Sequence, residues 1–403
     1  MNPLTSSSEK STLKLLMTDA SPSWGDQQYR LVREAVWLHE RAHEVIILCA
    51  ETSKLAANLQ RNAPWIRVEK VRSWGSPRAL LRLAGIIRRS QPDLIHTRSG
   101  QDSTWGSYFH LAGRTVVRSC HMTIPERVPI CDAIRYRFGC GRIIAAAHVI
   151  KRDLVDRAGV SDWRIDVVGE GANLEEFHPG LDGGGFRAEF KIPPKSPLFG
   201  VIAMLRPEKG QRTFIKAAAK VLSLVSDARF VIVGGGGGSY VDRLYEKIRR
   251  TFRQSPAPVI ITGYREDLSH VMGALDFVVV PSLDETQTIV IPQAFAAGKP
   301  VIASLVGGIP EVVRHEQNGL LVQPANHDAL AAAMLRLLAD RALRANLASA
   351  GLILARRELS FEEKAELVLE SYFRAVDQSA LDDQASADVR ARGSERFAQS
   401  AAR

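Results

Sequence analysis

The chain has 403 residues, of which 45% are hydrophobic and 24% charged, and its formal net charge is +9. This composition is typical of a globular protein, the length favours two domains, and no apolar run approaches the length of a membrane-spanning helix. The first twenty residues lack the apolar core of a signal peptide and the four cysteines lack metal-ligand spacing, so we expect a cytoplasmic protein with reduced thiols and no metal.

The positive charge is concentrated in the first part of the chain. Residues 1–173 contain 25 Lys and Arg against 17 Asp and Glu, whereas the remaining residues contain 28 against 27. A basic region favours an anionic partner. The sequence has no zinc module, recognition helix or basic patch interleaved with aromatic residues, so nucleic acid is not expected. We expect an acidic acceptor or an anionic membrane surface, which would place the protein peripherally at the inner face of the cytoplasmic membrane.

Strand-like and helix-like segments alternate through residues 1–173, the expected first domain. The predicted strands are apolar runs at 13–19, 43–49, 93–97, 114–120, 142–147 and 163–171. Such alternation indicates a parallel sheet with helices on both faces. Segment 77–91 combines leucine and isoleucine with four arginines, and we interpret it as an ordinary crossover helix in preference to a membrane-docking helix.

A Gly- and Pro-rich linker at 174–197 precedes a second alternating region at 198–359, the expected second domain. Its predicted strands lie at 198–205, 228–234, 259–263, 276–282 and 300–304, followed by helices at about 327–339 and 341–356. A last helix at 360–377 is expected to pack toward the first domain, and residues 378–403 are expected to be disordered. The sequence therefore predicts an α/β protein with two tandem Rossmann-like domains and a cleft between them.

Three loops that follow strands of the second domain carry the residues of chemical interest. Arg206 and Lys209 precede a predicted helix, and two cations at a helix N-terminus favour a diphosphate site. Five glycines at 234–238 indicate either close backbone approach to a ligand or a flexible loop. Glu285 lies between a strand and a short helix, where a carboxylate either caps the helix or contacts a ligand.

These segments together resemble the retaining glycosyltransferases of family 4, whose two Rossmann-like domains form the fold called GT-B. The resemblance rests on GANLEEFHP, LRPEKGQRTFIKAA, SLDETQTIVIPQAFAAGKPVIAS and VGGIPEVVRHEQNGLLVQP, and it extends over nearly the whole chain. It implies transfer of a sugar from a nucleotide-diphosphate sugar, which we expect to be a UDP-sugar, with retained anomeric configuration and no cofactor. The implied acceptor is a glycan or a lipid-linked molecule in the synthesis of lipopolysaccharide or envelope polysaccharide.

The resemblance assigns roles to residues of the second domain. Arg206 and Lys209 are expected to hold the diphosphate and stabilise the charge that develops on it, and Glu285 is expected to contact the hydroxyls of the donor sugar. Gln293 stands where the family has a second Glu, which binds the ribose. The usual Gly-Phe-Gly is replaced by residues 286–288, Thr-Gln-Thr.

Further assignments concern the nucleotide and the acceptor. The backbone N–H groups of Thr288 and Ile289 are expected to contact phosphate, and Tyr264 is also placed on the nucleotide side. Gly25 matches one glycine of the family's first loop, although Asp26 replaces the other.

Two residues near the end of the strand at 114–120 complete the site. His121 is expected to contact the donor sugar or the acceptor, and Arg118 is placed on the acceptor side. The other histidine at a strand end, His96, is expected to be structural.

Two alternative functions remain open from the sequence. One is a sugar-nucleotide epimerase or hydrolase of the same fold, which would keep the phosphate loop and need no acceptor. The other is a protein that binds nucleotide sugars without catalysis, which the departures at Gln293 and at 286–288 favour.

Overall fold

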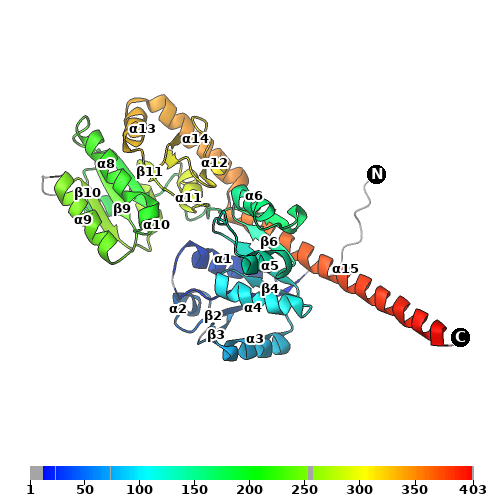
Figure 1. Cartoon of the computed structure of the whole chain (residues 1–403). Helices are drawn as coiled ribbons and strands as arrows, with labels where there is room; N and C mark the ends of the chain where they lie inside the picture. Colours follow the sequence, from blue (N-terminus) through cyan, green and yellow to red (C-terminus); the bar gives the residue numbers. More distant parts are fainter. Residues whose placement is uncertain (1–11, 23, 73, 253–256, 402–403) are drawn as a thin grey trace. The chain divides into compact units, whose positions relative to one another are not determined.

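The computed structural model describes residues 12–401 except residues 23, 73 and 253–256, with side chains as far as Leu381. The chain divides into two compact units (Figure 1), which are described separately. Unit 1 comprises the described residues up to Ala146, Ile150–Val168, and the chain from Ala365 onward. Unit 2 comprises Ala147–Val149 and Gly169–Lys364.

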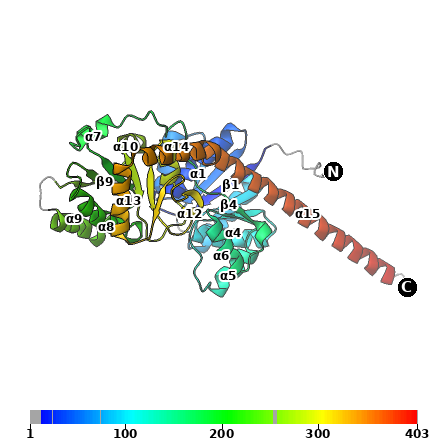
Figure 2. The same ribbon diagram turned by 90° about the horizontal axis from the view of Figure 1, so that it is seen from above.

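Unit 1 is built on a seven-stranded sheet in which every adjacent pair of strands is parallel, in the order β3-β2-β1-β4-β5-β6-β7. The strands are β1 (Lys14–Asp19), β2 (Glu44–Ala50), β3 (Arg67–Val71), β4 (Leu94–Thr97), β5 (Val116–Cys120), β6 (Arg142–Ala145) and β7 (Ile165–Val167). The helices are α1 (Asp26–Glu40), α2 (Lys54–Asn62), α3 (Pro77–Ser90), α4 (Gly100–Leu111), α5 (Ile130–Phe138), α6 (His148–Asp156) and α15 (Phe361–Ala401), with a 3₁₀ turn at Asp162–Arg164. The first residues of α6 and of α15 belong to unit 2. Figure 2 shows α4, α5 and α6 together on one side of this sheet.

Unit 2 contains a six-stranded parallel sheet in the order β10-β9-β8-β11-β12-β13. The strands are β8 (Leu198–Ile202), β9 (Arg229–Val233), β10 (Val259–Gly263), β11 (Phe277–Val280), β12 (Val301–Ser304) and β13 (Leu320–Val322). The helices are α7 (Gly184–Glu189), α8 (Gln211–Leu222), α9 (Ser239–Thr251), α10 (Leu268–Ala274), α11 (Val290–Ala296), α12 (Ile309–Val312), α13 (His327–Ala339) and α14 (Arg341–Glu358), with a 3₁₀ turn, η2, at Pro207–Lys209.

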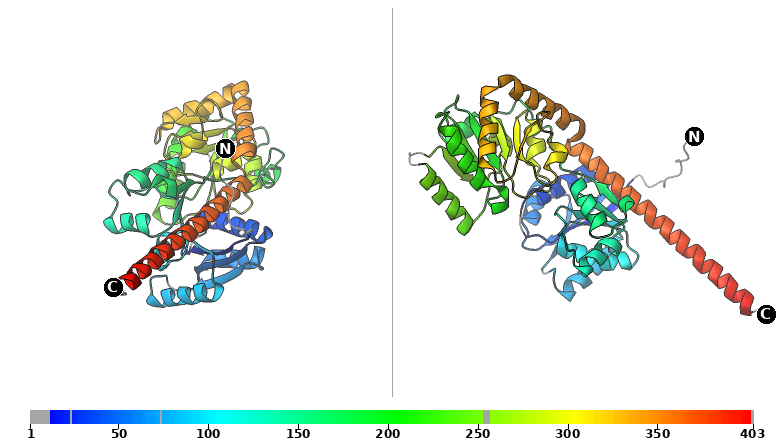
Figure 3. Two further views of the ribbon diagram at one scale, coloured as in Figure 1. Left: turned by 90° about the vertical axis from the view of Figure 1, so that its right-hand side faces the viewer. Right: turned by 45° about the horizontal axis from the view of Figure 1, so that its top comes forward.

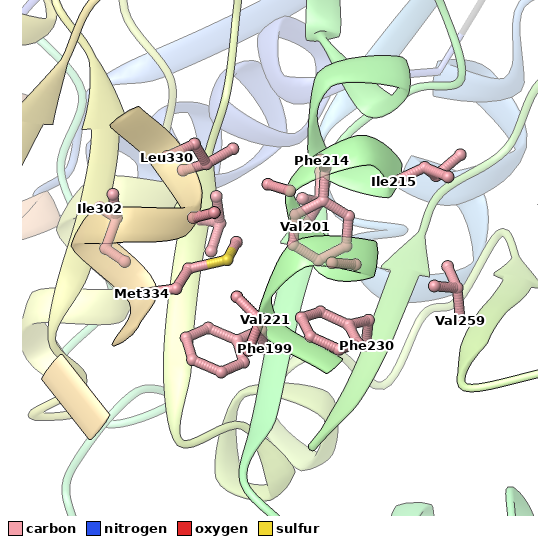
Figure 4. Close-up of a cluster of buried hydrophobic side chains, with 14 of the residues drawn as sticks. Phe199, Val201, Phe214, Ile215, Val221, Phe230, Val259, Ile302, Leu330 and Met334 are labelled. Carbon is pink, nitrogen blue, oxygen red and sulfur yellow. The ribbon is translucent and has the colours of Figure 1, made fainter. Parts of the chain in front are cut away.

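The core of unit 2 fixes the loops that begin α8 and α11. Phe199 on β8 stacks on Phe277 of β11, with ring centroids 4.4 Å apart, and on Phe230 of β9 at 5.5 Å. Phe214 of α8 packs edge-on against Phe230, and Met334 of α13 is buried in the same cluster (Figure 4). Truncating one such ring to Ala costs about 3–5 kcal/mol of stability, so β8, α8 and the loop between them are held firmly.

The sequence predicts both sheets, and the structure confirms two doubly wound parallel-sheet units. It misses two short strands, β3 and β13. β3 is an edge strand with the sequence RVEKV, whose residues are mostly exposed or half-buried, so it lacks the continuous apolar run by which buried parallel strands are recognised. β13 has only three residues.

The end of the chain differs from the expectation. Residues 378–403 are expected to be disordered, whereas α15 continues from Phe361 to Ala401 as one long helix (Figure 3). Its first turns are anchored in the protein by a stripe of buried residues at helical spacing, which includes Ala365, Val368, Tyr372 and Ala375. The sequence that follows contains no proline and alanine is its commonest residue, so a helix nucleated at the anchored end can continue.

The expected domain boundaries also shift. The first domain is expected to end at residue 173, whereas unit 1 ends at Val168 and takes up the chain again at Ala365. Residues 169–173 belong to unit 2 because their backbone bonds there: Ala172 N donates to Leu359 O at 2.8 Å, and Phe361 N donates to Ala172 O at 2.8 Å. No helix among the described residues is long and apolar enough to cross a membrane.

Candidate functional site

The centre of the site is an ion pair between two loops of unit 2. Lys209 Nζ lies 2.5 Å from Glu285 Oε2, and Ser282 Oγ donates to the same oxygen at 3.2 Å. Lys209 ends η2 after β8, and Glu285 follows β11, the adjacent strand in the sheet. Because both strands run in the same direction, their carboxyl ends meet at one edge, where open α/β sheets bind ligands.

The environment of Glu285 sets its ionisation. Burial raises the pKa of the Glu285 carboxyl, and the charge and hydrogen bond of Lys209 and the hydrogen bond from Ser282 oppose part of this rise. The Glu285 side chain is 7% exposed and that of Lys209 is 24% exposed. Lys209 is therefore the main group that opposes the rise in the pKa of Glu285, and its side chain remains partly exposed to a ligand.

Backbone contacts lock the two loops together. Leu283 N donates to Glu208 O at 2.7 Å. Gly210 lies in the left-handed region at φ +68°, and a Cβ there would come within 1.8 Å of Pro281 O. Glycine at position 210 is thus required for the close approach of the loop after β8 to the loop after β11.

Arg206 begins the same loop, directly before η2, but no ion pair to Glu285 is seen among the described residues. Its side chain is 55% exposed, and its Nη1 lies 3.9 Å from Glu208 Oε1, an ion pair worth little at the surface. The arginine is therefore positioned next to η2 and its guanidinium can pair with an anionic ligand.

The glycine run after β9 packs against the phosphate loop. Leu205 N donates to Gly235 O at 2.8 Å, and a Cβ at Gly236 would come within 2.6 Å of Leu205 Cβ. The sequence left open close approach to a ligand or a flexible loop, and the structure shows a third arrangement for this part of the run, in which the glycines pack against Leu205 of the protein itself. Tyr264, which follows β10, is exposed and lies against Gly235.

The helix α11 carries the remaining residues expected at the donor. Gln293 is 3% exposed, and its Oε1 has no hydrogen-bond partner within the part of the chain that the structure describes. Leaving such a buried acceptor unpaired costs about 1–3 kcal/mol, which a ligand hydroxyl would recover. Thr288 Oγ1 accepts from Val290 N at 3.4 Å and thereby caps the first turn, while Ile289 is the N-cap residue.

Three positions of the segment VGGIPE, residues 306–311, were not assigned a role from the sequence. Gly307, at φ +52°, lies where a Cβ would come within 1.7 Å of Glu285 O, and Gly308 N donates to that oxygen at 3.3 Å. The Glu311 carboxylate accepts from the backbone N–H groups of His148 and Val149, each at 2.8 Å, and so caps α6. The Gly-Gly pair directly after a strand in VGGIPE was the available signal.

The two histidines considered from the sequence, His96 and His121, have different environments. His96 Nδ1 is 2.6 Å from the Tyr372 hydroxyl and Nε2 is 2.8 Å from Ser119 Oγ, so both ring nitrogens are occupied by structural partners. Burial lowers the pKa of His121 to about 3, with the positive charges of Arg30 and Arg98 adding to the effect. His121 is therefore neutral at physiological pH, which suits hydrogen bonding to a sugar hydroxyl.

Arg118 does not share a face of the sheet with the residues around His96. Successive strand residues point to opposite faces, and Ser119 contacts His96. The Arg118 guanidinium instead lies 4.1 Å above the ring of Tyr136 on α5. Arg118 therefore faces α5, whereas His121 lies within the electrostatic range of Arg30 on α1. The roles of Arg118 and His121 stay predictions.

Gly25 shows no requirement for glycine. It is the N-cap residue of α1 with extended backbone, φ −166°, and a Cβ there would make only an ordinary contact, 3.7 Å from Gln28 Oε1. Asp19 organises this loop instead, since it accepts from Ser21 N at 2.8 Å and from Gln28 Nε2 at 2.6 Å. Among the described residues, no group of three or more His, Cys, Asp and Glu is arranged to hold a metal ion.

Comparison with known proteins identifies the family. Residues 196–340 match the family model described as glycosyl transferases group 1, and residues 28–176 match that of glycosyltransferase family 4. The chain belongs to the family 4 glycosyltransferases. The two matches cover the strands of both sheets except β1, and they include η2 and the Glu285 loop.

This glycosyltransferase is similar to curated and solved proteins over most of its length. It is 29% identical over 395 residues to the D-inositol 3-phosphate glycosyltransferase of Rhodococcus erythropolis, covering 89% of each chain. Anabaena HepE, solved with UDP and glucose, has a TM-score of 0.79 at 22% identity, over 89% of this chain and 99% of HepE. A glycosyltransferase of Rickettsia africae has a TM-score of 0.80 at 20% identity, over 92% and 99%. The fold is GT-B.

Proposed function

We propose that this glycosyltransferase moves a sugar from a UDP-sugar to a hydroxyl acceptor, with retained configuration and without a metal or other cofactor. The observation that carries the proposal is the ion pair of Lys209 with Glu285, next to the exposed guanidinium of Arg206. Together these three side chains would offer two cations to a diphosphate and one carboxylate to a sugar, at the same edge of the sheet of unit 2. HepE binds UDP and UDP-glucose in its solved complexes, and the shared fold supports a donor of this class.

Charge development explains the division of roles. Breaking the bond between the sugar and the phosphate leaves positive charge on the ring and additional negative charge on the departing diphosphate. Arg206 and Lys209 would stabilise the diphosphate, and preorganised donors of this kind contribute roughly 3–4 kcal/mol each. Glu285 would accept hydrogen bonds from the sugar hydroxyls as the ring becomes cationic.

The ribose is assigned to Gln293. Its buried Oε1, which has no partner among the described residues, would accept a hydrogen bond from a ribose hydroxyl. The backbone N–H groups of Thr288 and Ile289 and the exposed Tyr264 are proposed to contact the rest of the nucleotide. Retention of configuration is proposed from the family, as is the role of the neutral His121 toward the donor sugar or acceptor.

Two acceptor classes are consistent with the chain. The first is a glycan or lipid-linked acceptor in the synthesis of lipopolysaccharide or envelope polysaccharide. The second is a small phosphorylated polyol, which the printed activity of the Rhodococcus relative favours. Acceptors of both classes can carry negative charge, which a basic protein favours. Comparing turnover with an acceptor of each class distinguishes between them.

The basic charge of unit 1 and the exposed apolar side chains of its helix α5 support peripheral binding to an anionic membrane. Residues 72–139 contain 11 Lys and Arg against 4 Asp and Glu, which is most of the positive excess of the first domain. None of the nine residues of α5, all of which the structure describes, is buried. Ile130, Ile134 and Phe138 recur on it every four residues and are at least half exposed. Exposed apolar side chains beside arginines are typical of a helix at a membrane interface.

A panel of nucleoside diphosphates tests the donor. We expect UDP to raise the apparent melting temperature, because a ligand that binds only the folded state stabilises it. UDP-sugars would then be assayed for UDP release with and without acceptor, and the anomeric configuration of the product read by NMR. UDP release that no acceptor stimulates would favour the epimerase or hydrolase, and binding without turnover would favour the non-catalytic protein.

A further inference from the structure

Gln287 connects the Glu285 loop to the segment that leads from β7 into unit 2. Its Oε1 accepts a hydrogen bond from Glu170 N at 2.7 Å. Gly169 and Glu170 are the first residues of unit 2 after β7, and Gln287 lies two residues after Glu285. The side chain thus joins two segments that are more than a hundred residues apart in sequence.

Gly169 makes room for this side chain. A Cβ at Gly169 would lie 2.5 Å from Oε1 and 2.8 Å from Nε2 of Gln287, closer than real Cβ contacts. The backbone of Gly169 is outside the left-handed region, so glycine is not needed there for conformation. Gly169 and Gln287 therefore form a matched pair in which the glycine accommodates the amide.

The contact completes the support of the Glu285 loop. On one side, Gly308 N holds Glu285 O at 3.3 Å, and Gly307 lies close against the same carbonyl. After Gln287, Thr288 caps α11. A loop that carries a reacting carboxylate must be held within a fraction of an ångström to act, and such support comes from hydrogen bonds around it.

We propose that Gln287 is a positioning residue, which by bonding Glu170 N holds Glu285 in place toward the donor sugar. The proposal rests on the proposed function of Glu285. The family pattern has Phe at this position, so the amide tether is a feature of this chain. Glu285 contacts the sugar whereas Arg206 and Lys209 contact the diphosphate, so loss of the tether should affect the sugar more than UDP itself.

A double-mutant cycle tests the tether with Gly169→Ala, Gln287→Ala and the double variant. We expect each single variant to lower kcat about fivefold, the equivalent of one net hydrogen bond, while the Kd for UDP stays within twofold. The double variant should remain within twofold of Gln287→Ala, because the added methyl group then meets no amide. Gln287→Glu keeps an oxygen that accepts from Glu170 N and should retain most of the activity.

Hydrogen exchange of the backbone amides at 282–289 provides a readout that needs no donor. We expect faster exchange of these amides in both single variants, with no further increase in the double variant. This measurement reports on the hydrogen bond between Gln287 and Glu170 even if the proposed transfer reaction does not occur. Gly185→Ala, at a glycine with no atom within 4 Å of its Cβ position, and Gln317→Ala, at an exposed glutamine, are the matched controls.

Three results would overturn the proposal. The first is multiplication of the single effects to about 25-fold in the double variant, since independent sites multiply. The second is unchanged exchange at 282–289. The third is faster amide exchange at 282–289 together with an unchanged kcat in an active enzyme. That result would show that the hydrogen bond of Gln287 stabilises the loop but does not position Glu285.

Discussion

Lys209 and Glu285 are 76 positions apart in the sequence, and their charged groups meet at 2.5 Å. The pair joins the two functions that the sequence assigns separately, diphosphate binding and sugar contact. Removing either partner leaves the other without its counter-charge, which is more costly for the buried carboxylate than for the partly exposed ammonium. The two loops are therefore in direct contact at one edge of the sheet.

Loss of either cation should impair turnover. We expect Arg206→Ala and Lys209→Ala each to lower kcat by more than tenfold while the protein stays folded, because each removes charge from the departing diphosphate. Lys209→Ala should in addition move the acidic limb of the kcat/KM profile to higher pH. Lys209 lowers the pKa of Glu285, so its removal lets that pKa rise further. Near-normal turnover of both variants would remove the assignment of the phosphate site.

Glu285 and Gln293 should differ in kinetic effect. Glu285→Gln should lower kcat more than it raises KM, because the charge of the carboxylate matters most as the ring becomes cationic. Gln293→Ala should mainly weaken donor binding, by roughly 1–2 kcal/mol for one hydrogen-bonding group, and Gln293→Glu should be tolerated. Steady-state kinetics on the three variants measures both kcat and KM for the donor. If Gln293→Ala abolishes kcat while Glu285→Gln has no effect, the two roles are reversed.

Turnover should survive chelation of metal ions. In the proposed mechanism Arg206 and Lys209 provide the positive charge that a metal clamp would otherwise supply, and the sequence has no Asp-x-Asp motif. We expect activity within twofold of the untreated enzyme after incubation with EDTA and removal of the chelate. Activity that is lost and then returns with magnesium or manganese would contradict the proposed mechanism.

His121 should not titrate near neutral pH. Its pKa is lowered to about 3 by burial and by Arg30 and Arg98, so the ring stays neutral between pH 5 and 8. NMR of the imidazole C–H resonances, assigned with His121→Asn, should show a constant shift over that range. The free energy of unfolding should decrease as the pH falls from about 6.5, the pKa of this histidine in the unfolded chain, toward its lower pKa in the folded protein. In that range the unfolded chain binds a proton at His121 more readily than the folded protein does. An inflection for His121 near pH 6.5 would refute the buried neutral state.

Unit 1 should bind anionic vesicles at low salt. We expect the combined variant Ile130→Ser and Ile134→Ser to bind at least tenfold more weakly, and each lost arginine of α3 to cost about 1 kcal/mol, or about fivefold. Cosedimentation with anionic and neutral vesicles at two salt concentrations measures this. Leu224→Ser, at an equally exposed leucine of unit 2, is the control. Equal loss in the control, or no binding of the wild type at low salt, would end the membrane assignment.

Local patterns in the sequence determined the two parallel-sheet units and the loops that carry Arg206, Lys209 and Glu285. They suffice because strand and helix periodicity and glycine placement depend on near neighbours. The same patterns led to disorder being expected after residue 377, because composition does not reveal that a helix anchored at Tyr372 continues outward.

Only the tertiary structure decided which distant groups meet. The contact of Lys209 with Glu285, the support of the Glu285 carbonyl by Gly307 and Gly308, and the bond from Glu170 to Gln287 all join segments brought together by strand order. Arg118 and Ser119 are neighbours in sequence, yet one contacts α5 and the other contacts His96. Such contacts depend on strand order and on which face of the sheet each residue occupies, and both are set by the packing of the whole sheet rather than by adjacent residues.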